Sequence, residues 1–257
     1  MAAVSRLSIA PVKGLGLVQA GEIALDKFGV LENRRFYVRD AAGEFVNALK
    51  HPELFRVTPA YDPHGETLAL RFPDGAVVEA EVNLGEQVTT DFYGRKVEGR
   101  LVAGPLAEAL SAHAGAPLEL VQTDEPGAAV DRARGPVSLV SDESVEELAR
   151  QAGRERVDAG RFRMLIGIRG VEPHGEDEWI GRKVRVGNAV IRLLEQVARC
   201  AITTRDPLTG ERDLDTLRLI KDYRGVRGKK QLDFGVYGTV VEAGRVRIGD
   251  AVEPLAS

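Results

Sequence analysis

Short runs of alternating apolar and polar residues dominate the chain, separated by Gly, Pro, Asp and Asn. Residues 34–40 (RRFYVRD) predict a strand that turns at AAGE and resumes at FVNAL. Two hairpins are predicted, one over residues 67–82 around a Pro-Asp-Gly turn and one over residues 182–195 around Gly-Asn. Residues 234–255 predict further strands on either side of Ala243.

Helical periodicity is confined to three segments. Residues 105–115 begin with a proline, which the first turn of a helix tolerates, and end at a glycine. Residues 141–153 place Ser144 three positions before Glu147, the spacing of a capping box, and residues 214–224 carry apolar residues at helical spacing. Many strands with few helices indicate a mainly β or α+β fold that contains a barrel.

The stretch 123–137 (TDEPGAAVDRARGPV) is the most linker-like part of the sequence, because it is rich in Pro, Gly, Ala and charge. It predicts a division into two domains, residues 1–122 and residues 123–257. A chain of 257 residues is long enough for two small domains.

The composition excludes several classes of protein. Hydrophobic residues make up 44% of the chain, enough for a core, and aromatic residues only 5%, so the core must rely on aliphatic side chains. A formal net charge of −4 gives no basic surface for nucleic acid. No segment approaches the ~20 apolar residues of a membrane span, and the N-terminus lacks a secretory apolar core. We therefore expect a soluble cytoplasmic protein without nucleic-acid or membrane partners.

The chain has one cysteine, Cys200, which excludes an internal disulfide and an iron–sulfur cluster held by this chain alone. Arg199 precedes it, Thr203 and Thr204 follow, and a polar turn begins at Asp206. A neighbouring guanidinium favours the thiolate form of a cysteine, and a thiolate is a nucleophile or a ligand for a soft metal. A free cysteine is also often a small apolar residue of a core, so both interpretations stay open at this point.

Other titratable residues give weaker signals. The histidines have no metal-ligand spacing, so a Cys–His catalytic pair has little support and structural or surface roles are expected for His51, His64, His113 and His174. Glu176, Asp177 and Glu178 are expected in a surface loop, and Trp179 in the core.

Taken together, these segments resemble the MOSC family. The resemblance is carried in the second half by residues 198–210 (ARCAITTRDPLTG), 161–168 (RFRMLIGI), 175–191 and 233–252. In the first half it is carried by residues 7–16 (LSIAPVKGLG), 29–54 and 67–75. It implies an N-terminal β-barrel-like domain followed by a MOSC β-barrel with a few short helices. Two-domain members of the family include reductases of N-hydroxylated bases such as amidoximes.

The resemblance implies a molybdenum-cofactor site, in which a molybdopterin holds molybdenum and Cys200 is the thiolate ligand and catalytic residue. Such a cofactor is anionic, and Arg suits phosphate because its donors are bidentate. Arg161 and Arg163, two positions apart, are expected to share one face of a strand. The resemblance also brings an association with pyridoxal phosphate binding, at the level of the family and not for any residue of this chain. The cofactor-binding residues implied by the resemblance are Lys13, Arg34, Arg161, Arg163, Arg199, Thr203 and Thr204.

Three functions remain open. The first is an oxidoreductase that reduces a small N-hydroxylated substrate with electrons from a separate donor protein. The second is a carrier of sulfur or of the cofactor, with a persulfide on Cys200. The third is an interaction barrel in which Cys200 is only packed. The first two place the thiol at a strand end facing a pocket between the halves, with Lys13, Arg34, Arg161 and Arg163 converging on it.

The sequence departs from the family pattern beside several of these residues, so the resemblance defines the domain better than it defines the substrate. Met164-Leu165 follows Arg163 where Pro-Asn is common, Gly14 follows Lys13 where serine is frequent, and Asn33 replaces an aspartate before Arg34. Arg134-Gly135 stands where Thr-Ser is found in relatives.

Overall fold

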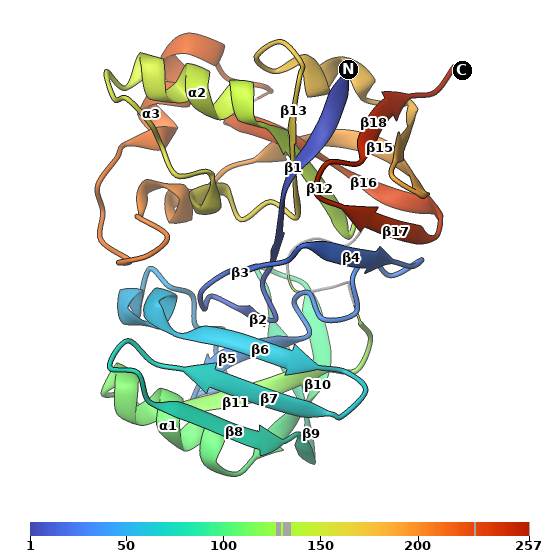
Figure 1. Cartoon of the computed structure of the whole chain (residues 1–257). Coiled ribbons are helices and arrows are strands. Elements are labelled where there is room, and N and C mark those ends of the chain that lie inside the picture. Colours follow the sequence, from blue (N-terminus) through green and yellow to red (C-terminus); the bar gives the residue numbers. More distant parts are fainter. Residues whose placement is uncertain (127–129, 131–134, 229, 257) are drawn as a thin grey trace.

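The computed structural model describes residues 1–126, 130, 135–228 and 230–256. It is mainly β, with three α-helices in that part of the chain, so the predicted fold class is confirmed. Figure 1 shows two packed lobes, one above the other, with both termini in the upper lobe. The upper lobe is built from the second half of the chain together with the first strand.

A closed seven-stranded barrel forms the upper lobe. The strand order is β13-β12-β16-β15-β14-β18-β1, and β1 closes the ring by pairing antiparallel with β13, where Leu7 lies opposite Ile166. Closure leaves no unpaired edge within the ring. The barrel strands are β1 (Ala2–Ile9), β12 (Val137–Ser141), β13 (Ile166–Arg169), β14 (Lys183–Val186), β15 (Ala189–Ala198), β16 (Asp233–Glu242) and β18 (Ala251–Pro254).

Several of the first thirty residues therefore share the core of the second half, whereas Val12 and Leu15 pack in the core of the lower lobe. Val4 and Leu7 of β1 are fully buried against aliphatic side chains of the barrel, and Ile23 packs in the same cluster. Two short strands extend this arrangement: β3 (Val18–Gln19) pairs with β1, and β4 (Glu22–Leu25) pairs with β17 (Gly244–Arg247). The strands predicted on either side of Ala243 are present as β16 and β17. The partner of β17 is β4.

The lower lobe contains two smaller sheets around a second apolar core. Helix α1 (Pro105–Ala114) packs on β11 and ends at Gly115 in the left-handed conformation, as its sequence predicts. The five-stranded sheet contains β2 (Val12–Lys13), β5 (Phe36–Asp40), β11 (Leu118–Thr123), β10 (Lys96–Ala103) and β9 (Asn83–Asp91), and the three-stranded sheet contains β6 (Thr58–Asp62), β7 (Thr67–Arg71) and β8 (Val77–Glu81).

Both predicted hairpins form, as β7–β8 and β14–β15. The strand predicted to resume at residues 45–49 does not form. One isolated bridge, between Arg39 and Phe45, joins this segment to β5. The segment instead runs through turns into the 3₁₀ helix Pro52–Arg56, and it forms one wall of the cavity described below.

Helices α2 (Asp142–Gln151) and α3 (Thr216–Arg224) cover the outside of the barrel. The predicted cap of α2 is wrong: the N-cap is Ser141, whose hydroxyl accepts a hydrogen bond from the backbone N–H of Ser144 at 3.1 Å. Ser144 is pulled into the interior because its hydroxyl bonds Glu176, and a buried carboxylate needs such donors.

Glu176 lies in the 3₁₀ helix Gly175–Trp179, and the prediction that it belongs to a surface loop is wrong. Its carboxyl group is fully buried and accepts hydrogen bonds from the hydroxyls of Ser141 at 2.8 Å and of Ser144 at 2.9 Å. Burial raises the pKa of Glu176, while these hydrogen bonds act against that rise. Trp179 is buried in the barrel core, as expected.

The stretch 123–137, which predicted the domain boundary, runs from the last residue of β11 to the first residue of β12. Residues 127–129 and 131–134 of it, including Arg134, fall outside the described residues. The division at residues 122 and 123 stays a prediction.

Candidate functional site

Cys200 lies two residues beyond the end of β15, where the chain leaves the barrel. Its backbone is extended (φ −126°, ψ 176°), and the 3₁₀ turn Ala201–Thr204 follows directly. The thiol is exposed. The predicted position at a strand end is confirmed, and the alternative of a thiol buried in a core is wrong.

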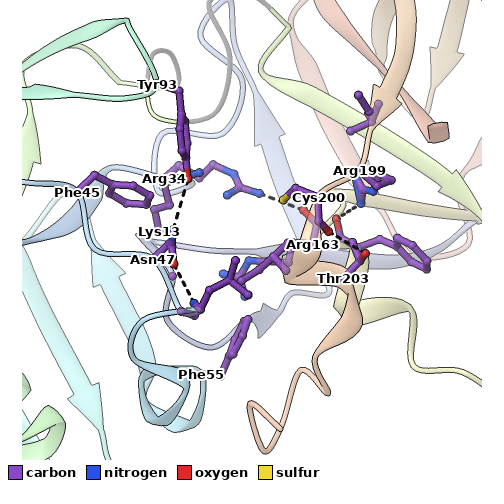
Figure 2. Close-up of a pocket in the computed structure, with 17 residues that line it drawn as sticks. Lys13, Arg34, Phe45, Asn47, Phe55, Tyr93, Arg163, Arg199, Cys200 and Thr203 are labelled. Atoms are coloured by element: carbon purple, nitrogen blue, oxygen red, sulfur yellow. Dashed lines mark hydrogen bonds between the residues drawn. The ribbon is translucent and has the colours of Figure 1, made fainter. Parts of the chain in front are cut away.

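A cavity of about 230 Å³ opens beside this thiol at the junction of the two lobes. Figure 2 shows Cys200, Arg163, Arg199 and Thr203 on one side and residues of the first half on the other. The predicted pocket between the halves is thus present. Its lining residues are Lys13, Gly14, Arg34, Phe45, Asn47, Ala48, Leu49, Phe55, Tyr93, Phe162, Arg163, Val197, Ala198, Arg199, Cys200, Ile202 and Thr203.

Of the four cations predicted to converge on the thiol, three reach the cavity, and they come from separate segments. Lys13, on β2, lies over the ring of Phe45 with its Nζ 5.5 Å from the ring centre. The Arg34 guanidinium donates to the carbonyl of Arg163 at 3.1 Å, and the Arg163 guanidinium donates to the carbonyl of Leu15 at 2.7 Å. These two bonds tie the halves together across the site. Positive charge concentrated in this way favours an anionic ligand.

Backbone strain is also concentrated at the cavity. Of the five non-glycine residues with positive φ among those described, three line it: Arg34 (φ 57°), Tyr93 (φ 57°) and Arg163 (φ 51°). Such conformations cost on the order of 1–3 kcal/mol each and persist where the surrounding structure imposes them. The surrounding structure therefore imposes an unfavourable backbone conformation at three residues of the cavity.

Arg199 lines the cavity, but its guanidinium is directed to the barrel side. The guanidinium donates to the backbone carbonyl of Phe162 and contacts the sulfur of Met164 at 3.6 Å. Its central carbon also lies 5.1 Å from the centre of the Phe162 ring. Met164 is itself buried. The unusual residue after Arg163 therefore fills the core beneath the site.

Arg161 does not converge on the cavity, so this part of the prediction is wrong. The i, i+2 argument requires a strand, whereas residues Ala159–Phe162 form a 3₁₀ helix and Arg163 is left-handed, so the two side chains diverge. The side chain of Arg161 is 2% exposed and pairs with Asp213 at 3.1 Å. Thr204 is also outside the lining, and its hydroxyl donates to the carbonyl of Ala201 at 2.7 Å.

The wall facing Cys200 was not predicted from the sequence. It contains Phe45, Asn47, Phe55 and Tyr93, and the Asn47 amide lies 3.5 Å from the Tyr93 hydroxyl. Tyr93 is 83% exposed at the mouth of the cavity. The available signal was Tyr93-Gly94 between two strands, which favours a tight turn that projects its first side chain.

Two departures from the family pattern, Gly14 beside Lys13 and Asn33 beside Arg34, fit the local backbone. Gly14 lines the cavity at φ +94°, a conformation that serine adopts only with strain. Asn33 is buried, and its side-chain oxygen accepts the backbone N–H of Ala10 at 2.9 Å, which fixes the turn that presents Arg34.

Within the described part of the chain no group of three or more His, Cys, Asp or Glu side chains could hold a metal ion. Over the same residues, no helix is both long enough and apolar enough to cross a bilayer.

Fold and site together define a two-lobed β-barrel protein with an exposed thiol and three cations around a cavity at the lobe junction. The chain belongs to the MOSC family: the model of the MOSC domain matches residues 111–253, and that of the MOSC N-terminal beta barrel domain matches residues 1–112.

Curated relatives connect the family with the molybdenum cofactor. A molybdenum cofactor sulfurase of Caenorhabditis briggsae is 28% identical over 250 residues, which cover 91% of this chain and 34% of that protein. The chain thus spans about a third of the sulfurase. Mitochondrial amidoxime-reducing component 1 of mouse is 25% identical over 279 residues, covering 97% of this chain and 81% of the relative.

Among solved structures, the YuaD protein of Bacillus subtilis superposes with a TM-score of 0.50 at 14% identity, covering 99% of this chain and 96% of that one. A likeness at this identity supports the fold alone.

Proposed function

We propose that this chain is a molybdenum-cofactor-dependent oxidoreductase that reduces small N-hydroxylated compounds, with Cys200 as the thiolate ligand of molybdenum. The observation that supports this best is the exposed thiol sharing one cavity with Lys13, Arg34 and Arg163. A thiolate is a suitable ligand for a soft metal, and guanidinium groups suit a phosphate. The residues present therefore fit a pterin cofactor that carries both a soft metal and a phosphate.

In this proposal each residue has a defined task. Cys200 binds the metal, and the three cations neutralise the charge of the pterin phosphate. When bound, the cofactor supplies the two-electron chemistry that breaks an N–O bond. Phe45 and Tyr93 belong to the opposite wall, where their rings would contact one side of the substrate. The hydrogen bonds that Arg34 and Arg163 donate to backbone carbonyls keep both guanidinium groups oriented before any ligand arrives.

The overall reaction takes two electrons and two protons, and it converts the N-hydroxylated group to N–H with release of water. One cysteine cannot hold an iron–sulfur cluster, so we propose that the electrons come from a separate donor protein. A single thiol without a disulfide also suits a reducing compartment, and we propose the cytoplasm.

A carrier of sulfur or of the cofactor is the second candidate, favoured by the exposure of Cys200 and by the sulfurase relatives. Turnover separates the two. Protein loaded with cofactor, given a chemical reductant and N-hydroxybenzamidine, is expected to release benzamidine catalytically, and the Cys200→Ser variant is not. Leu208→Ala is the control, because Leu208 is 72% exposed and does not line the cavity.

Release of no more than one benzamidine per chain would contradict the reductase. If cyanide then removes sulfur from Cys200 as thiocyanate, the persulfide carrier replaces it.

A further inference from the structure

Arg161 is a buried cation that the cavity does not use, and it lies under the turn that carries Cys200. Its Nη1 donates to the carbonyl of Thr203 at 3.0 Å. The same guanidinium binds both carboxylate oxygens of Asp213, at 3.2 and 3.1 Å. Taking a guanidinium out of water is costly, and the bonds from Nη1 and Nη2 to Thr203 and Asp213 offset part of that cost. The Nε of Arg161 is buried and has no hydrogen-bond partner among the described residues. The bonds to Thr203 and Asp213 fix the backbone of the turn from below.

Thr203 connects this guanidinium to the cysteine. The Thr203 hydroxyl donates to the carbonyl of Cys200 at 3.0 Å, and its backbone N–H lies 3.1 Å from the same oxygen. A hydroxyl has one hydrogen, so in the pair between Thr203 and Thr216, 2.7 Å apart, Thr216 is the donor. Thr216 is fully buried at the start of α3. The thiol-bearing residue is thus held through Thr203 by two buried groups.

Asp213 completes the arrangement. Its backbone N–H donates to the carbonyl of Thr204 at 3.2 Å, so it bonds the turn directly and also through Arg161. Burial acts to raise the pKa of Asp213, but the hydrogen bonds from Arg161 and Arg154 outweigh it, and the pKa is lowered. Arg154 reaches the same carboxylate at 2.8 Å from the surface and does not touch the turn.

We propose that Arg161, paired with Asp213, is a positioning residue that directs the Cys200 thiol into the cation-lined cavity and does not itself bind the cofactor. This inference rests on the role of Cys200 in the proposed function. In this proposal the buried ion pair between Arg161 and Asp213 determines where the Cys200 sulfur points. A purely structural ion pair would stabilise the fold without any effect on where the thiol points.

The test uses the apo protein and the fact that Cys200 is its sole thiol. The rate of alkylation by iodoacetate, an anion, is divided by the rate with neutral iodoacetamide. Both reagents consume the same thiolate, so the ratio reports the charge that the sulfur faces. The reference is N-acetylcysteinamide, a small thiol that carries no other charged group. At low ionic strength we expect the ratio for the parent protein to be about tenfold higher than for this reference.

In Arg161→Gln we expect the ratio to fall to within about twofold of the small thiol, since the sulfur no longer faces the cations. Arg161→Lys should recover part of the parent ratio, because it keeps the charge but not both hydrogen-bond directions. Arg154→Gln is the matched control: it removes a partner of the same Asp213 and should keep the parent ratio. Asp213→Asn serves as a milder second variant, and circular dichroism checks that each protein is folded.

A folded Arg161→Gln or Asp213→Asn protein with the parent ratio would overturn the proposal, as would a parent whose ratio equals that of the small thiol. The assay contains no molybdenum. A failure of the parent to bind molybdenum would therefore remove the proposed function while leaving this result readable on its own.

Discussion

At the scale of single residues, the cavity is built on backbone conformations that few side chains adopt freely. Gly14 at φ +94° directly follows Lys13 and lines the same cavity. A Cβ at Gly14 would meet only ordinary van der Waals contacts, the nearest at 3.8 Å from the carbonyl oxygen of Val46. Any cost of a substitution at Gly14 therefore reports backbone strain.

Gly14→Ser is expected to lower the free energy of unfolding by about 1–2 kcal/mol, because serine must adopt a left-handed backbone at this position. Urea denaturation measures the change. Gly21→Ser is the matched control, since Gly21 has no positive φ and a Cβ there meets nothing within 4 Å. Equal effects of the two substitutions would show that the strain at Gly14 is not significant.

The residues of the site were predictable to different degrees. Cys200 was found because a lone thiol between Arg199 and a polar turn is an unusual pattern, and Lys13 and Arg34 because their segments resemble the family. Arg161 was misassigned because its side chain points according to a 3₁₀ turn, which periodicity does not reveal. Tyr93 was missed because tertiary packing alone brings its hairpin to the cavity.

At the scale of elements, His174 joins the loop after β13 to α3. Its ring contacts the Tyr223 hydroxyl at 3.1 Å and the Arg224 guanidinium at 2.8 Å. Burial, and then the charge of Arg224, lower the pKa of His174 to about 4. An unfolded histidine takes up a proton below about pH 6.5, so between those values the unfolded state binds more protons than the folded one.

Stability is therefore expected to fall as the pH drops from about 6.5 to about 4, with about 1–2 kcal/mol of the loss due to His174 after allowance for its partial exposure. In His174→Asn this share of the loss should disappear, and asparagine tolerates the left-handed backbone (φ 63°) at this position. Urea midpoints at pH 4.5 and pH 7 measure it. An identical pH dependence in parent and variant would contradict the assignment.

Elements were easier to predict than their partners. The hairpins and α1 follow from turn residues and periodicity, which act locally. The pairing of β1 with β13 and of β17 with β4 could not be predicted, because it depends on closing the barrel between segments far apart in sequence. Glu176 shows the same limit, since its hydroxyl donors lie more than thirty residues away.

At the scale of the whole molecule, the loop that follows Cys200 packs on the first half of the chain. The Arg205 guanidinium donates to the carbonyl of Leu49 at 3.4 Å, and Gly210 lies against Pro52. A Cβ at Gly210 would be only 2.2 Å from the carbonyl oxygen of Pro52. This close approach helps to hold the lobes together at one rim of the cavity.

Gly210→Ala is expected to lower the free energy of unfolding by about 1–3 kcal/mol more than Gly249→Ala, since overpacking adds to backbone strain only at Gly210. Both glycines have positive φ, 77° and 91°, but a Cβ at Gly249 meets nothing within 4 Å. Denaturant titration of the two variants isolates the lobe contact. Equal losses would contradict a close contact at this rim.

The role of Cys200 is tested most directly by the molybdenum content of protein purified from a host that makes the cofactor. We expect close to one molybdenum per parent chain and a large loss in Cys200→Ser, because a soft metal site binds thiolate far better than a hydroxyl of similar size. Leu208→Ala, exposed and outside the cavity, should retain the parent content. Molybdenum retained at the parent level by folded Cys200→Ser would contradict thiolate ligation.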